Sequence, residues 1–208
     1  MLIRQDSRMD SEEYGMILRR PFVYMRHGQT NYNVNDWYCG SSEAVLTPEG
    51  EEQARSAAAL LNRDWSVVVA SGLQRAQRTA QLAVPNTDLL IDTRFNERHF
   101  GADEGQPIQR PINHLATPPE GEPWADFRNR VADGLNAILE QYTLPLFVAH
   151  GAVYRCIYDI FYNTTECEAF PNATPVLIEP VGDTDDDSHW RITPLAELSA
   201  DQMASLIS

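Results

Sequence analysis

The sequence predicts an α/β fold, a three-layer sandwich in which helices flank a mostly parallel central sheet. Short apolar runs, such as Phe22-Val23-Tyr24-Met25 and Leu146-Phe147-Val148-Ala149, have the length of buried strands. Longer segments with apolar residues at helical spacing lie between these runs. Because strands that alternate with helices usually pair in parallel and are covered on both faces, the alternation indicates this fold class.

The predicted strands are short and rich in apolar residues, and they cover residues 22–26, 66–70, 88–91, 146–149, 176–179 and 190–193. The predicted helices cover residues 48–62, a segment that ends near residue 82, and residues 123–142 and 152–162. Thr47 is the expected N-cap of the first helix, with Pro48 in its first turn. The third helix has apolar residues at helical spacing, namely Phe127, Val131, Leu135, Ile138 and Leu139.

A single domain accounts for most of the chain. Its 208 residues, 43% of them hydrophobic, can bury a substantial core, and no shift in composition marks a second domain. We expect a flexible N-terminal tail over residues 1–16 and one domain over residues 17–208. The tail lacks the apolar region of a secretory signal, and the apolar runs elsewhere are too short to span a membrane.

Charge and cysteine content restrict the partners. The formal charge of −14 repels a phosphate backbone, so nucleic acid is excluded as a partner. An anionic ligand then needs a local group of cations, for which the candidates are Arg26, Arg75, Arg78 and Arg98, although the last two can instead pair with carboxylates. The three scattered cysteines indicate free thiols in a cytoplasmic protein. The acidic run at residues 183–187 lacks the pattern of a calcium loop and is expected to be a solvated turn.

Candidate chemistry is concentrated where two predicted strands end. Arg26, His27 and Gly28 follow the first apolar run, and His150 follows another. The carboxyl edge of a parallel sheet is where α/β proteins bind ligands, so one crevice can collect both histidines. A histidine beside a fixed cation can attack or hold a phosphoryl group. For the Arg-His pair alone, the alternative is a structural histidine bonded to a backbone carbonyl.

The segment around Arg26-His27-Gly28 resembles the signature of the histidine phosphatase superfamily, in the branch that contains cofactor-dependent phosphoglycerate mutases and many small-molecule phosphatases. Four further segments agree with that branch in order and approximate spacing: residues 46–54, 71–80, 95–105 and 147–151. The resemblance extends from about residue 22 to about residue 180. It implies a phosphoglycerate mutase-like fold and an enzyme of phosphoryl-group chemistry.

The resemblance and the chemistry of phosphate esters together give each site residue an expected role. His27 is the candidate nucleophile, which becomes a phosphohistidine while its other ring nitrogen donates to a carbonyl. Arg26 and Arg75 are expected to bind the phosphate oxygens through two-pronged hydrogen bonds. His150, as an imidazolium, and Asn33, as an amide donor, complete the predicted phosphate site.

Glu97 is the candidate proton donor to the leaving oxygen, and it returns as the base that activates water. Glu43, Glu104, Glu120 and Glu122 are rival carboxylates near the proposed site. We expect that no metal and no cofactor take part, because the arginines supply the electrostatic stabilisation. The partner is then a small phosphorylated metabolite, and one candidate assembly is a homodimer.

A metal-independent phosphomonoesterase is the predicted function. The segment between Gly101 and Trp124 is shorter than the mutase insertion, and Ala152 stands where mutases have an asparagine. A mutase must exclude water from its intermediate, which a short insertion does less well. Phosphoglycerate mutase-type transfer is the alternative, and a catalytically silent phospholigand-binding module is a third hypothesis. Arg110 and His114 are candidate contacts for a carboxylate or a second phosphate.

Overall fold

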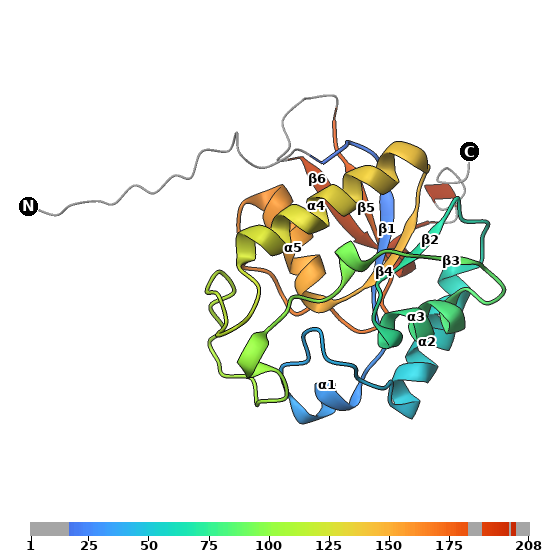
Figure 1. Ribbon diagram of the computed structural model, residues 1–208. Helices are drawn as coiled ribbons and strands as arrows, with labels where there is room; N and C mark the ends of the chain where they lie inside the picture. The colour runs from blue at the N-terminus through green and yellow to red at the C-terminus, as the bar shows by residue number, and fades with distance from the viewer. Residues whose placement is uncertain (1–16, 183–188, 200, 203–208) are drawn as a thin grey trace, which may run out of the picture.

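The computed structural model describes residues 17–182, 189–199 and 201–202 (Figure 1). The expected tail at residues 1–16 and the expected acidic turn at residues 183–187 lie outside the described residues. The six strands of the sheet are β1 (Phe22–Arg26), β2 (Val68–Ala70), β3 (Leu89–Ile91), β4 (Leu146–Ala149), β5 (Val176–Pro180) and β6 (Trp190–Pro194).

The strands are arranged in the order β3-β2-β4-β1-β5-β6. The first four of these pair in parallel, whereas β5 pairs with β1, and β6 with β5, in the antiparallel direction. The predicted mostly parallel sheet is therefore confirmed. The two antiparallel strands form one edge region, next to the strand that carries the Arg-His-Gly motif.

Five α-helices connect and cover the strands in the described part of the chain: α1 (Asn31–Asn35), α2 (Pro48–Leu61), α3 (Gln74–Ala83), α4 (Trp124–Gln141) and α5 (Gly151–Tyr162). Short 3-10 turns lie at Thr93–Phe95, Gly101–Asp103 and Leu195–Glu197. Helices α2 and α3 cover one face of the sheet, and α4 and α5 cover the other (Figure 1). No helix in these described ranges is long and apolar enough to cross a membrane.

The side chains of β1 alternate between two cores, as the two-residue period of a strand requires. Phe22 and Tyr24 pack into the core with α4 and α5, whereas Val23 and Met25 pack into the core with α2 and α3. All four side chains are fully buried. A strand that is apolar on both faces must lie inside the sandwich, and this explains the continuous apolar run in the sequence.

The strand register brings the two motif histidines together. β1 and β4 are parallel neighbours, and Arg26 is paired with Ala149 at their carboxyl ends. His27 and His150 therefore follow neighbouring strands at the same edge of the sheet. Because the register is a property of the backbone, the fold places both imidazoles next to each other before any ligand binds.

Candidate active site

The candidate nucleophile, His27, is almost completely buried, with 4% of its surface exposed. Its Nδ1 lies 2.7 Å from the carbonyl oxygen of Gly28. Because a carbonyl can only accept, Nδ1 carries the proton and Nε2 carries the lone pair. The hydrogen bond that the sequence predicted is present, and it selects the tautomer that can attack through Nε2.

The backbone of the histidine loop is held from two sides. The N–H of Gly28 donates to the hydroxyl of Thr79 at 2.9 Å, and this hydroxyl in turn donates to the carbonyl of Arg75 at 2.7 Å. The side-chain amide of Asn172 donates to the carbonyl of His27 at 2.8 Å. These contacts fix the loop to α3 and to the segment before β5, so the ring of His27 cannot easily turn.

Two glycines let the histidine loop approach helix α2 closely. A Cβ atom on Gly28 would lie 2.3 Å from the carbonyl oxygen of Gly50, and one on Gly50 would lie 2.0 Å from that of Gln29. Real Cβ atoms do not approach backbone oxygens so closely, so neither position accepts a side chain without a shift of the backbone. The first turn of α2 therefore packs directly against the histidine loop.

His150 lies against His27, with ring centroids 5.2 Å apart and the ring planes at 58°. Tyr24 fixes the backbone of His150 through two hydrogen bonds. The Tyr24 hydroxyl donates to the carbonyl of His150 at 2.6 Å and accepts from the N–H of His150 at 3.0 Å. The imidazole Nε2 lies 2.7 Å from the hydroxyl oxygen of Ser71. Both the backbone and the ring of His150 are thus fixed by residues of other strands or their ends.

The two candidate arginines reach the same place from different elements. Arg26, at the end of β1, donates through Nη1 to the carbonyl of Phe170 at 2.7 Å. Arg75, in the first turn of α3, donates to the carbonyls of Gly40 and Ser42 at 2.7 and 2.8 Å. Every acceptor is an uncharged carbonyl, so neither guanidinium is neutralised by these bonds.

We call Arg26, His27, Arg75 and His150 the strand-end cluster. Three of its buried nitrogen atoms have no hydrogen-bond partner in the described part of the chain: Nε of Arg26, Nε of Arg75 and Nδ1 of His150. A buried polar atom without a partner is destabilising by about 1–3 kcal/mol. Such atoms gathered in one cluster indicate a polar ligand that completes their hydrogen bonds.

The electrostatics of the cluster oppose any further positive charge. Burial, together with the charges of Arg26 and Arg75, holds the pKa of His27 well below its usual range. Burial and the nearby Arg75, His27 and Arg26 lower the pKa of His150 in the same way. Both imidazoles are therefore neutral in the ligand-free protein. The imidazolium that the sequence predicted at His150 concerns the phosphate-bound state and stays a prediction.

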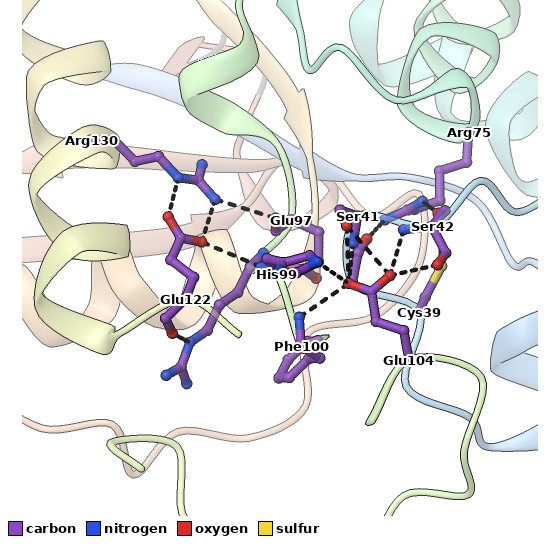
Figure 2. A network of polar contacts seen from close by, with 12 residues as sticks. Cys39, Ser41, Ser42, Arg75, Glu97, His99, Phe100, Glu104, Glu122 and Arg130 are labelled. Atoms are coloured by element: carbon purple, nitrogen blue, oxygen red, sulfur yellow. Dashed lines mark hydrogen bonds and ion pairs between the residues drawn. The ribbon is translucent and has the colours of Figure 1, made fainter. Parts of the chain in front are cut away.

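Glu97 lies beside the cluster and is held on both carboxylate oxygens. Oε1 accepts from the N–H of Arg98 at 3.0 Å, and Oε2 accepts from the N–H of Ala152, in the first turn of α5, at 3.1 Å. The backbone carbonyl of Glu97 accepts from Arg130 at 3.2 Å (Figure 2). Burial lowers the pKa of Arg26, and the nearby Glu97 carboxylate partly offsets this by raising it. The two charges are therefore close enough to interact.

The rival carboxylates are engaged elsewhere or face solvent. Glu122 forms an ion pair with Arg130 at 2.6 Å. Glu104 accepts several hydrogen bonds from a neighbouring loop. Glu43 and Glu120 are exposed, and the Glu43 carboxylate accepts from the N–H of Gln74 at the start of α3 at 3.2 Å. The geometry therefore favours Glu97 as the carboxylate next to the cluster.

Asn33 takes part in the capping box of α1, a helix that the sequence did not predict. Its Oδ1 accepts from the N–H of Thr30 at 3.0 Å, while the Thr30 hydroxyl accepts from the Asn33 N–H at 3.3 Å. Asn172, which bonds the carbonyl of His27, lies 3.5 Å from the same Oδ1. With the amide oxygen engaged, the side-chain nitrogen of Asn33 is the group that remains to meet a ligand.

Three further arginines do not join the cluster. Arg78 pairs with Glu51 at 3.0 Å, as its alternative role predicted. Arg98 is buried but donates to three backbone carbonyls rather than to a carboxylate, which corrects both expectations for it. Arg110 forms a two-pronged ion pair with Asp36 at 2.7 and 2.9 Å. The arginines whose charges act on His27 are Arg26 and Arg75.

Several residues that support the cluster were not singled out from the sequence, namely Tyr24, Ser71, Thr79, Arg130 and Asn172. One signal could have identified Tyr24, because it precedes Arg26 by two residues on β1 and therefore faces the same side of the sheet. The described residues contain no group of three or more His, Cys, Asp or Glu side chains that could hold a metal ion. Cys39, Cys156 and Cys167 are free thiols, as predicted.

Two buried histidines and two arginines at the carboxyl edge of a mostly parallel sheet define a class of protein, an α/β enzyme of phosphoryl-group chemistry. The chain belongs to the histidine phosphatase superfamily (branch 1), whose family model matches residues 22–175. The resemblance stated from the sequence is therefore confirmed. A phosphohistidine mechanism on small phosphorylated substrates is typical of this family.

Curated relatives include both kinds of enzyme that the sequence suggested. The uncharacterized phosphatase PhoE of Bacillus subtilis (strain 168) is 30% identical over 140 residues, which cover 64% of this chain and 72% of the relative. The probable phosphoglycerate mutase GpmB of Serratia proteamaculans (strain 568) is 30% identical over 159 residues, covering 65% and 72%.

Solved structures agree on the fold. A putative alpha-ribazole-5'-P phosphatase from Escherichia coli superimposes with a TM-score of 0.71 at 23% identity, over 85% of this chain and 96% of that chain. At this level of identity the likeness supports the predicted phosphoglycerate mutase-like fold alone.

Proposed function

We propose that the protein is a metal-independent phosphomonoesterase that hydrolyses a small phosphorylated metabolite through a phosphohistidine on His27. The observation that carries the proposal is the set of three unpartnered buried nitrogens on Arg26, Arg75 and His150, beside an imidazole in the attacking tautomer. A phosphoryl group offers several acceptor oxygens and negative charge to these nitrogens. A bound phosphoryl group therefore gives these nitrogens hydrogen-bond acceptors, and its negative charge offsets the repulsion between the two arginines.

In the first half-reaction, Nε2 of His27 attacks phosphorus and forms the N–P bond as the ester O–P bond breaks. Arg26 and Arg75 bind the non-bridging oxygens, where charge is spread in the transition state. Glu97 takes up a proton when the negatively charged phosphoester binds beside it, passes this proton to the leaving oxygen, and the alcohol departs. The incoming phosphate charge favours the imidazolium form of His150, which then donates to a phosphoryl oxygen.

In the second half-reaction, the Glu97 carboxylate takes a proton from water, whose oxygen attacks the phosphohistidine. The N–P bond breaks, its electron pair returns to Nε2, and inorganic phosphate is released. The one carboxyl group serves as acid and then as base, because the proton that it gives to the alcohol is replaced by a proton from water. The cycle therefore returns the site to its starting protonation state.

Hydrolysis is favoured over mutase transfer because the arginines of residues 97–123 are already bonded. Residues 97–123 contain two, Arg98 and Arg110. Arg98 is committed to three backbone carbonyls, and Arg110 to Asp36. Burial and two nearby arginines lower the pKa of His114 to about 4, so its ring is neutral. A substrate with a carboxylate or a second phosphate would thus have to compete for cations already bound.

The covalent intermediate provides the test. After brief exposure to a ³²P-labelled phosphoester and acid-free quenching, we expect a base-stable, acid-labile adduct on the wild-type protein and none on His27→Ala. His114→Ala is the matched control, because it removes a half-buried, neutral imidazole outside the cluster. An adduct that is acid-stable, or that persists in His27→Ala, contradicts the proposal. Release of phosphate with no conversion of 3-phosphoglycerate, with or without bisphosphoglycerate, separates phosphatase from mutase.

A homodimer along the edge strand β3 is the assembly that we propose. This strand ends the sheet and exposes Leu90 and Ile91, at 39% and 43% of their surfaces. Unpaired apolar edges of this kind commonly meet a second chain. Sedimentation of the wild type and of Ile91→Lys tests it, and a monomeric wild type contradicts it. The three free thiols support a reducing, cytoplasmic location.

A further inference from the structure

The carboxylate of Glu104 joins two segments that lie far apart in the sequence (Figure 2). Oε1 accepts from the N–H of Ser41 at 2.8 Å and from the N–H of Phe100 at 3.1 Å, and Oε2 accepts from the N–H of Ser42 at 2.9 Å. The hydroxyls of Ser41 and Ser42 donate to the same carboxylate. The side chain is only 11% exposed. This is a dense set of donors for a carboxylate that is not in the strand-end cluster.

The loop that Glu104 holds is the loop that holds Arg75. The guanidinium of Arg75 donates to the carbonyls of Gly40 and Ser42, which flank Ser41. Gly40 has a positive φ of 54°, and a Cβ atom there would lie 2.1 Å from Oε1 of Glu104. The glycine thus permits both the turn and the close approach of the carboxylate. The chain of contacts from Glu104 to the guanidinium passes through one short backbone segment.

We propose that Glu104 is a positioning residue that aims Arg75 at the substrate phosphate, by fixing the two carbonyls to which the guanidinium is bonded. The inference rests on the proposed phosphomonoesterase function. With both Nη atoms tied to this loop, the unpartnered Nε of Arg75 has a fixed direction. Preorganised donors of this kind stabilise a transition state without reorganisation during the reaction.

The carboxylate is suited to this task because it stays ionised. Burial raises the pKa of Glu104, but hydrogen bonds from Ser42, Ser41 and Phe100 outweigh burial and lower the pKa below its usual range. His99 also approaches, with Nε2 3.9 Å from Oε1. An ionised carboxylate only accepts, which matches the surrounding N–H and O–H donors. A glutamine would turn an N–H₂ group toward some of these donors and release part of the loop.

Two other roles for Glu104 predict different results. As the general acid, it would matter more for a poor leaving group than for a good one. As a charge near an anion site, it would oppose phosphate, and its removal would tighten phosphate binding. The positioning role predicts weaker phosphate binding and an equal loss of activity on both kinds of substrate.

The experiment measures Glu104→Gln against the wild type with an alkyl phosphate and an activated aryl phosphate, and inhibition by inorganic phosphate. We expect kcat/KM to fall by about 10–100-fold on both substrates, the usual effect of disturbing an outer-shell partner, and phosphate inhibition to weaken. Glu120→Gln makes the same change of charge at an exposed position and should leave both unchanged. A loss confined to the alkyl phosphate, or tighter phosphate inhibition, overturns the proposal.

A double-mutant cycle with Arg75→Lys separates this inference from the proposed function. Lysine cannot bond both carbonyls as the guanidinium does, so Glu104→Gln should cost at most about 2-fold in the Arg75→Lys background. Full additivity means that Glu104 does not act through Arg75. If Glu104→Gln does not fold, Ser42→Ala, which removes one donor, takes its place in the cycle. An inactive wild type would refute the proposed function instead.

Discussion

Two pairs of buried or half-buried arginines in this protein differ in how completely they are bonded. Arg98 and Arg130, which we call the loop-anchoring arginines, use all three guanidinium nitrogens on backbone carbonyls or on Glu122. Arg26 and Arg75, in the strand-end cluster, each leave Nε without a partner in the described residues. The first pair fixes residues 94–122, whereas each arginine of the second pair keeps a donor for the anion that we propose.

The difference shows how structural and ligand-binding cations can be told apart. Burying a cation is unfavourable unless hydrogen bonds replace its water, so a structural arginine is bonded on every side. A ligand-binding arginine must keep donors unused, and the fold tolerates this because other contacts compensate. Glu97 lies between the two regions, since Arg130 holds its carbonyl while its side chain reaches Ala152.

The largest expected effect comes from Glu97, where the two regions meet. Glu97→Gln should lower kcat for an alkyl phosphate by about 10²–10⁴-fold, the usual contribution of general acid catalysis, and much less for a nitrophenyl phosphate. The leaving group explains the difference, because nitrophenolate departs without a proton. Steady-state kinetics on both substrates provide the measurement. Equal losses would instead give Glu97 a positioning role.

A matched pair of substitutions tests the comparison itself. Arg75→Met should lower kcat by about 10²–10³-fold, as the loss of one transition-state donor does, and the free energy of unfolding by about 2 kcal/mol, because two carbonyls lose their donor. Arg98→Met should lower the free energy of unfolding by about 3 kcal/mol, because three buried carbonyls lose their donor. Urea denaturation and kinetics on both variants give the four values. If Arg75→Met were less stable than Arg98→Met, the distinction between ligand-binding and structural arginines would be contradicted.

A smaller effect is expected from the neutral histidines. His27 and His150 have pKa values lowered by burial and by the arginines, so the unfolded chain binds more protons than the folded protein below about pH 6.5. The free energy of unfolding should therefore fall as pH falls from 7 to 5.5, by about 1 kcal/mol for each histidine. In His150→Gln, the free energy of unfolding should fall by about 1 kcal/mol less over this pH range than in the wild type. An identical pH dependence in urea titrations of both proteins would contradict the burial argument for His150.

The smallest expected effect is that of chelation. Because the arginines provide the positive charge of the strand-end cluster, turnover in the presence of EDTA should stay within about 2-fold of turnover without it. The assay compares EDTA-treated enzyme with enzyme to which Mg²⁺ or Zn²⁺ is returned. Activity that is lost with EDTA and restored by one of these ions would refute metal independence.

The sequence predicted those elements whose signals are local, such as an apolar run or a helix-capping residue. β1 and β4 have the predicted bounds, and the N-cap at Thr47 is confirmed by its hydrogen bond to Gly50. Helix α1 was missed because five residues are too few to show helical periodicity, and its only signal is the local capping box at Thr30.

Contacts between distant residues account for the remaining differences. Tyr24 bonds His150 across 126 residues, and no local pattern announces such a pair. Arg98 was expected to meet a carboxylate, yet carbonyls of the folded loop surround it, and their positions exist only after folding. The neutral state of His150 likewise depends on how deeply the fold buries it beside Arg75.

Because Gly28 and Gly50 lie in close contact, the histidine loop cannot be transferred to another protein by itself. Each glycine leaves room for the backbone of the other segment, so neither can be exchanged for a larger residue by relaxing its partner. A chimaera with a crossover between these positions would join a loop from one parent to a helix start shaped by another. Anyone grafting Arg26-His27-Gly28 onto a different sheet must carry the first turn of α2 with it.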